Sequence, residues 1–261
     1  MADNLPTLDP DALRERLQAG ERLRAFAFDA SFDWRDIDGE TAAFVGCRFD
    51  GAVFDNSAFA GASFTDCRFL SCRFPHADLR EAVFTGCSFN PAGKPATGAQ
   101  FPFTDLQRSR FQRCDLSFAR FERADLHAAE LEDCNLRGAR FEQAEFSHAL
   151  GRKQVVTRLV LRDCNLELAQ LAGAGLATCD LSGSRFREAD LSGADLTGAV
   201  LRDADLFQAE LAGTKLANAD LRGAEISGLT LTVLASFKGL KITAEQQHLL
   251  LGAMGIDVLP A

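Results

Sequence analysis

The sequence predicts an all-β solenoid, in which short extended segments wind into stacked coils. A large apolar residue, Phe or Leu, recurs at every fifth position through most of the chain, and a small residue precedes it by two. A five-residue period fits neither an amphipathic helix nor a strand, so it indicates a repeat. Twelve of the 21 glycines follow the large residue by two positions, where a tight turn needs a positive φ. Each unit is therefore expected to point two side chains into a common lumen and then turn a corner.

Residues 1–43 are expected to cap the first coil. Asp9 as the N-cap and Gly20 as the terminator predict a helix over residues 9–20. A solenoid end exposes both its lumen and an unpaired strand edge, so it needs a cover. The aromatic residues that follow the helix are expected to plug this end, namely Phe26, Phe28, Phe32 and Trp34.

The repeat region is expected to span residues 44–231 with two interruptions. Residues 90–100 contain two Pro and two Gly and no large apolar residue, and residues 147–155 place Gly151 where a large residue is due. The period is expected to resume at Val156 and Leu161. Both interruptions are expected to project as loops, where they either carry binding function or are tolerated insertions. Their cations are the candidate loop contacts, namely Lys94, Arg152 and Lys153.

Residues 232–261 are expected to form the second cap. Thr243 and Gln246 form a capping box that predicts a helix ending near Ala253. The segment is more apolar than one cap requires, and two interpretations stay open. It plugs the last coil, or it buries surface against a second copy in a two-fold dimer. The candidate dimer residues are Leu249, Leu250, Met254, Ile256 and Val258.

The eight cysteines all occupy the small inward slot, two residues before a large apolar one. Several are twenty residues apart, so their Cα–Cβ vectors are expected to run parallel on adjacent coils, which is a poor geometry for a disulfide. We expect free, buried thiols that act as small hydrophobic groups. The four histidines are scattered without a second ligand at metal spacing, and no nucleophile elbow or phosphate loop is present. We therefore expect no enzymatic activity, no cofactor and no metal site.

The repeat units, such as ADLSG and ADLTG near residue 195, resemble the A(D/N)LXX units of the pentapeptide-repeat family. The resemblance covers roughly residues 44–231 and implies a right-handed quadrilateral β-helix, with about nine coils of roughly twenty residues. At a coil spacing of ~4.8 Å the rod would be about 43 Å long, similar to a dozen base pairs at ~3.4 Å each. The ending LLLGAMGIDVL is similar to that of the Qnr and MfpA quinolone-resistance members, in which this segment dimerises.

The charge of the chain is negative, with a formal net charge of −9. In coils of this size, carboxylates twenty or forty residues apart stack into columns, and together they are expected to form an acidic face. That face is either an ordinary solvated surface or a surface whose charge imitates a nucleic-acid duplex. Direct binding of nucleic acid would instead require a basic stripe. The expected columns are Asp105, Asp125 and Glu145; Asp180 and Asp220; Asp190 and Glu210; Asp205 and Glu225.

The Qnr and MfpA resemblance implies DNA gyrase or topoisomerase IV as the protein partner. The leading hypothesis is a dimeric, non-enzymatic DNA mimic that protects this enzyme from quinolones or a natural topoisomerase toxin. The competing hypothesis is a protein-interaction scaffold that shares only the fold. The acidic start lacks the apolar core of a signal peptide and no apolar run is long enough to span a membrane, so we expect a soluble, cytoplasmic protein.

Overall fold

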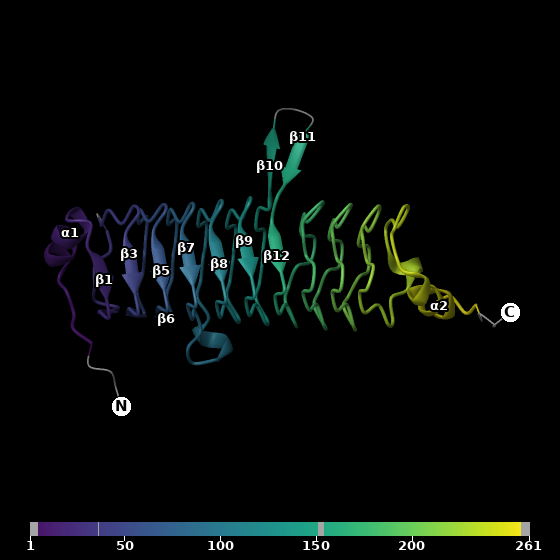
Figure 1. Cartoon of the computed structure of the whole chain (residues 1–261), viewed down its shortest axis with the longest axis horizontal. Helices are drawn as coiled ribbons and strands as arrows, with labels where there is room; N and C mark the ends of the chain where they lie inside the picture. Colours follow the sequence, from purple (N-terminus) through teal and green to yellow (C-terminus); the bar gives the residue numbers. More distant parts are fainter. Residues whose placement is uncertain (1–4, 36, 151–153, 257–261) are drawn as a thin grey trace.

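The structure is a computed structural model that describes residues 5–35, 37–150 and 154–256. It is a straight rod with helix α1 at one end and helix α2 at the other, and a hairpin projects from its middle (Figure 1). The predicted solenoid is confirmed. Its helices are α1 (Pro10–Gln18), η1 (Pro95–Thr97), η2 (Leu231–Val233) and α2 (Ala244–Ala253).

The coils pair through parallel three-residue strands. The larger sheet contains β1 (Arg22–Arg24), β3 (Ala43–Val45), β5 (Ser63–Thr65), β7 (Val83–Thr85), β8 (Arg110–Gln112), β9 (Glu130–Glu132) and β12 (Val160–Arg162). The smaller contains β2 (Ala27–Asp29), β4 (Arg48–Asp50) and β6 (Arg68–Leu70). Single β-bridges continue these ladders where the strands are too short to be assigned.

Four columns of outward residues define the four sides of the rod, and within a column each residue bridges its neighbour one coil away. The register is usually twenty residues and lengthens where a segment projects, as from Val83 to Arg110 and from Glu130 to Val160. The columns are side 1 (Asp38 to Glu145, and Gly175 to Ser236 beyond the hairpin), side 2 (Arg22 to Lys241), side 3 (Ala27 to Glu225) and side 4 (Val53 to Glu210).

The lumen is filled by the large residues of the repeat, stacked coil on coil. Phe49, Phe69 and Phe89 stack with centroids 4.7 and 4.6 Å apart and planes within 5° of each other. The C-terminal coils replace these rings largely by Leu, and Leu196 is fully buried. All eight cysteines are free and buried in the small slot, as predicted. Burial raises the pKa of the Cys72 and Cys179 thiols to about 12.

The corners carry the positive φ values that the glycine pattern predicts. All twelve repeat glycines have φ between 61° and 88°. The same position also accepts larger residues, such as Phe103 at 55° and Leu168 at 61°. Each of these two donates its N–H to a carbonyl of the next coil, at 2.9 and 3.0 Å. This bond offsets the roughly 1–2 kcal/mol cost of a left-handed conformation for a residue with a Cβ.

Both ends are covered by apolar plugs. Asp9 caps α1 by accepting the N–H of Ala12 at 2.8 Å, and Trp34 is buried against Phe54 with centroids 4.6 Å apart. At the other end, the Gln246 amide donates to the carbonyls of Leu221 and Ala224, each at 2.8 Å, so α2 closes the last coil. Within the described residues, neither helix has the length and apolarity to cross a membrane.

The first interruption is an excursion that leaves the corner between sides 3 and 4 and returns at Gln100. Asn90 anchors its base, because its amide donates to the Ser117 carbonyl at 3.2 Å and its Oδ1 accepts the Thr97 hydroxyl at 2.6 Å. The bridge from Arg73 to Gln100 preserves the coil register across it.

The second interruption is an antiparallel hairpin, β10 (Ser147–Leu150) with β11 (Gln154–Thr157). The expectation that the period resumes at Val156 is wrong, because Val156 pairs with His148 inside the hairpin. The lumen is re-entered at Leu159, which is 1% exposed. Two strands that pair only with each other can leave the coil without breaking its ladders.

Candidate protein interface

The predicted columns of carboxylates are present. Bridges join Asp105 to Asp125 and Asp125 to Glu145 on side 1. They also join Asp190 to Glu210 on side 4 and Asp205 to Glu225 on side 3, and Val200 stands between Asp180 and Asp220 on side 2.

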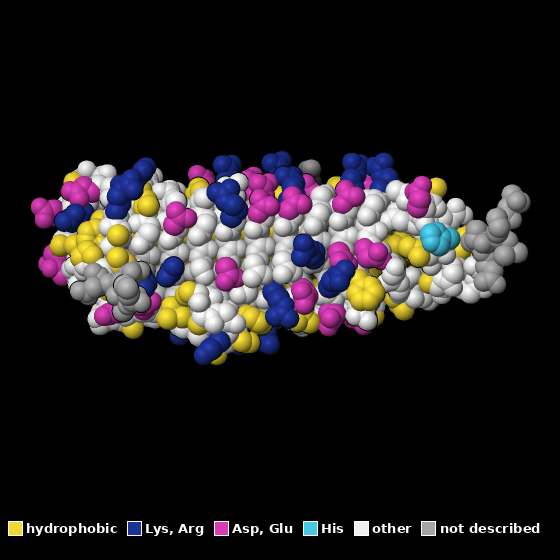
Figure 2. Space-filling model, turned by 60° about the horizontal axis from the view of Figure 1, so that its bottom comes forward, with side chains coloured by type: hydrophobic (Ala, Val, Ile, Leu, Met, Phe, Trp, Pro, Cys, Tyr) yellow, Lys and Arg dark blue, Asp and Glu magenta, His cyan; other side chains and the backbone are white. Residues whose placement is uncertain are grey.

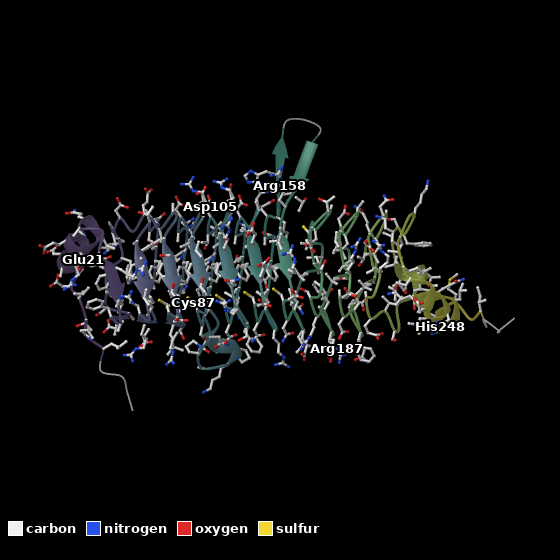
Figure 3. All side chains as sticks on the ribbon, viewed as in Figure 1. Glu21, Cys87, Asp105, Arg158, Arg187 and His248 are labelled. Atoms are coloured by element: carbon white, nitrogen blue, oxygen red, sulfur yellow. The ribbon has the colours of Figure 1, made fainter. Side chains whose placement is uncertain are left out.

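The prediction that they form a single acidic face is wrong, however, because these four columns lie on four different sides of the rod. One five-residue unit advances the chain by one side, so carboxylates that differ by five or ten residues cannot share a face. Figure 2 shows the result on one aspect of the rod, where negative, positive and apolar side chains are interspersed. In Figure 3, Asp105 lies at one edge of the rod and Arg187 at the opposite edge.

Three carboxylates of sides 2 and 3 pair with arginines at the adjacent corner of the rod, on the same coil or on the coil before. Asp220 accepts from Arg202 at 2.8 Å and Arg222 at 2.7 Å. Asp180 accepts from Arg162 at 2.7 Å, and Asp205 pairs with Arg187. The hydrogen bond from Arg222 and then that from Arg202 hold the pKa of Asp220 well below its usual range. The negative net charge of residues 161–231 is therefore not a continuous negative surface.

Side 1 carries the longest column of carboxylates, Asp78, Asp105, Asp125 and Glu145. The Gln107 amide bridges two of its members, donating to Asp125 at 3.0 Å and Asp105 at 3.4 Å. Partial burial raises the pKa of Asp105, and the nearby charges of Asp125 and Asp78 raise it further. Arg80 pairs with Asp78 and lies 3.7 Å from Asp105. These carboxylates repel one another at coil spacing, so the column is a genuine concentration of negative charge.

The projecting hairpin joins the rod beside this column. His148 contacts Asp125 at 3.0 Å, and its ring stacks on that of His127 with centroids 4.4 Å apart. Sequence reasoning missed this cluster because the histidines are 21 positions apart, and only the coil register brings them together. Side 1 and the hairpin base thus form one surface, with Asp105, Asp125, Glu145 and His148 as its polar groups.

The predicted loop contacts are separated by the structure. Lys94 is exposed on the excursion, which projects from the opposite edge of the rod to the hairpin in Figure 1. Arg152 and Lys153 lie outside the described residues. A single partner would have to wrap the rod to reach both projections.

The C-terminal tip is partly apolar. Leu249, Met254 and Ile256 are 36%, 48% and 47% exposed. Leu250 is only 6% exposed, so it belongs to the plug of the last coil and not to a dimer interface. Val258 lies outside the described residues. Of the two interpretations of this segment, Leu250 fulfils the first, and its exposed neighbours remain available for the second.

No catalytic or metal-binding arrangement is found in the part of the chain that the structure describes. No three His, Cys, Asp or Glu side chains there are placed to hold a metal ion. Two open grooves lie on the surface, one beside α1 and one near the C-terminal end. The second is lined by Phe207, Leu211 and Val233 among others.

Comparison with protein families gives two matches, both described as pentapeptide repeats. The first covers residues 42–70, 62–90, 164–203 and 199–232. The second covers residues 106–150. Together they span more than half of the chain. No curated protein matches it.

Comparison with solved structures finds QnrB1, a plasmid-mediated fluoroquinolone resistance protein. The full-length QnrB1 structure is 26% identical, covers 81% of this chain and 99% of QnrB1, and superposes with a TM-score of 0.75. Two trypsin-treated variants of QnrB1 are also 26% identical, with TM-scores of 0.73 and 0.70. They cover 83% and 82% of this chain and 98% and 96% of their own.

Proposed function

The chain belongs to the pentapeptide-repeat family. On that premise we propose that it is a non-enzymatic protein that mimics DNA and binds DNA gyrase or topoisomerase IV. In this role it protects the enzyme from quinolones or from a natural topoisomerase toxin. Its similarity to a fluoroquinolone resistance protein along nearly the whole of that protein supports the proposal. The proposal also includes a homodimer through the C-terminal tip and a cytoplasmic location.

The observation that carries the proposal is the carboxylate column of side 1 beside the hairpin. Asp78, Asp105, Asp125 and Glu145 follow each other at successive coils. At a rise of ~4.8 Å per coil they present a line of negative charge along the rod. A cationic groove that ordinarily holds DNA phosphates would attract such a line, and salt would weaken the attraction. In this proposal the hairpin touches the enzyme beyond the groove.

A gyrase supercoiling assay with and without ciprofloxacin, titrated with this protein, tests the proposal. Neutralising side 1 by Asp105→Asn, Asp125→Asn and Glu145→Gln keeps side-chain size and removes three negative charges. We expect at least a tenfold higher protein concentration for half-maximal effect. The matched control removes three charges from the opposite side 3, by Asp115→Asn, Asp205→Asn and Glu225→Gln, and should act like the wild type.

The competing function is a protein-interaction scaffold without a topoisomerase role. The pairing of Asp180, Asp205 and Asp220 with arginines favours it, because these sides lack the charge of a mimic. If excess wild-type protein leaves gyrase activity unchanged both with and without drug, the mimic is refuted and the scaffold remains. Equal loss of activity in the side 1 and side 3 variants would refute the assignment to side 1.

A further inference from the structure

The outward column of side 4 changes sign halfway along the rod. Its successive members from the second coil onward are Arg73, Gln100, Arg120, Arg140, Gln170, Asp190 and Glu210. We propose that two copies of this chain associate side by side and antiparallel through side 4, about a two-fold axis at Gln170. This interface is separate from the C-terminal tip and does not rest on the proposed function.

The register of the column makes side 4 complementary to itself. In an antiparallel pair, a residue one coil before Gln170 faces the residue one coil after it in the other copy. Arg140 then faces Asp190, and Arg120 faces Glu210. Because both rods have the same coil spacing, these positions coincide without adjustment, and the two-fold axis makes each contact occur twice.

These charges are available for a partner. Arg120 has no ion pair among the described residues, and Arg140 approaches Glu142 only to 3.7 Å. Asp190 and Glu210 accept hydrogen bonds from Ser192 and Ala212 of their own turns, and neither pairs with a cation in the described part of the chain. They differ in this from Asp180, Asp205 and Asp220, which pair with arginines of the neighbouring coil.

Apolar residues at the corner between sides 3 and 4 are also arranged symmetrically about the proposed two-fold axis. Leu168 lies at the coil of the proposed axis, Phe118 two coils before it and Phe207 two coils after it. Leu168 is 36% and Phe207 38% exposed, whereas Phe118 is half-buried. The antiparallel pair places Leu168 against its own copy and Phe118 against Phe207.

The corner between sides 4 and 1 is complementary in size. Its C-terminal half holds small residues, Ser192 with Gly193 and Ala212 with Gly213. Its N-terminal half holds long ones, Glu142 with Gln143 and Glu122 with Arg123. The two-fold axis sets each long pair against a small pair, so the rods can approach closely.

In the antiparallel pair, the excursion of one copy would lie beside the C-terminal coils of the other copy. It returns to the rod at Gln100, three coils before Gln170, and therefore faces the position three coils after it in the other copy. There the side 4 ladder has ended at Glu210, and the groove lined by Phe207, Leu211 and Val233 lies beside it. Lys94 on the excursion would come near Glu210 of the second copy.

Sedimentation velocity of the full chain carrying Leu249→Glu and Met254→Glu, which disable the tip, tests the interface. We expect a dimer that dissociates as salt rises. Arg140→Glu or Asp190→Arg alone should raise the dissociation constant at least tenfold, because each creates two like-charge contacts. The double exchange should restore the dimer, and an equimolar mixture of the two single variants should form it as well.

Glu225→Arg, an equal charge reversal on side 3, is the matched control and should leave the dimer intact. Circular dichroism verifies that every variant is folded. The proposal is overturned if the tip-disabled protein is monomeric at tens of micromolar in low salt. It is equally overturned if the single reversals leave the dimer unchanged, or if neither the double exchange nor the mixture restores it.

Discussion

Replacing Leu196 by Asp is the sharpest test of which side chains point into the lumen. Leu196 is fully buried and donates its N–H to the Lys215 carbonyl at 2.9 Å. Leu176 and Leu216, one coil to either side, are also fully buried, so the new carboxylate would sit between two apolar layers. Neither leucine side chain can hydrogen-bond or neutralise the new carboxylate.

The cost can be estimated in two parts. Truncating a buried Leu costs about 2–5 kcal/mol, because apolar burial is lost and a cavity remains. Burying a carboxylate without a partner adds several kcal/mol, or forces it to stay protonated. The sum, about 5 kcal/mol or more, is comparable to the whole unfolding free energy of about 5–15 kcal/mol of an ordinary domain. The coils around Leu196 should therefore open while distant coils persist, since a solenoid is stabilised by nearest neighbours.

Urea unfolding followed by far-ultraviolet circular dichroism measures this effect across a graded series. Leu196→Ala should lose about 2–5 kcal/mol and Leu196→Asp more. Thr197→Asp, one residue on and half-buried at the corner, should lose less than about 1 kcal/mol. Equal losses for Leu196→Asp and Thr197→Asp would refute the assignment of inside and outside.

Other expectations follow from the same structure. Asp220 has a folded-state pKa below its unfolded value, so its ion pairs stabilise the fold above about pH 4 and are lost as the pH falls through the lowered value. Asp220→Asn should therefore reduce the fall of the melting temperature at acid pH. An unchanged acid dependence would contradict this expectation. Because each thiol fills a lumen slot, reductant should shift the melting temperature by no more than a few degrees, and elemental analysis should find no stoichiometric metal. A large fall of the melting temperature on reduction, or bound zinc, would contradict this packing of the thiols. Joining residue 146 directly to residue 158 should reduce drug protection more than simple gyrase inhibition, and equal reductions would deny the hairpin a separate contact.

The repeat itself was predictable because the residues of each five-residue unit determine the local conformation of that unit. The apolar slot, the small slot and the turn glycine together determine which side chains face inward, and all twelve repeat glycines adopt the expected φ. The caps followed from local signals as well, such as the capping box of Thr243 and Gln246. The columns of carboxylates followed from the coil length.

The distribution of charge over the four sides could not be predicted from the sequence, because it depends on how side chains at the corners reach across coils. Arg162 pairs with Asp180 and Arg202 with Asp220 over 18 positions, a spacing that has no meaning outside this coil geometry. The contact of His148 with Asp125 depends likewise on how the hairpin leaves the rod. Leu250 differed from its neighbours only in the rotation of α2 against the last coil, which a run of three Leu does not reveal.

The burial of Trp34 in the first coil also gives the rod a built-in optical label. The chain has one Trp and no Tyr, and its other aromatic residues are 22 Phe. Its intrinsic fluorescence above 300 nm therefore reports on the N-terminal coil, where Trp34 packs against Phe28 and Phe54. Circular dichroism, by contrast, averages over every coil. A denaturation curve recorded by both signals would tell which end of the rod frays first, without any dye or substitution.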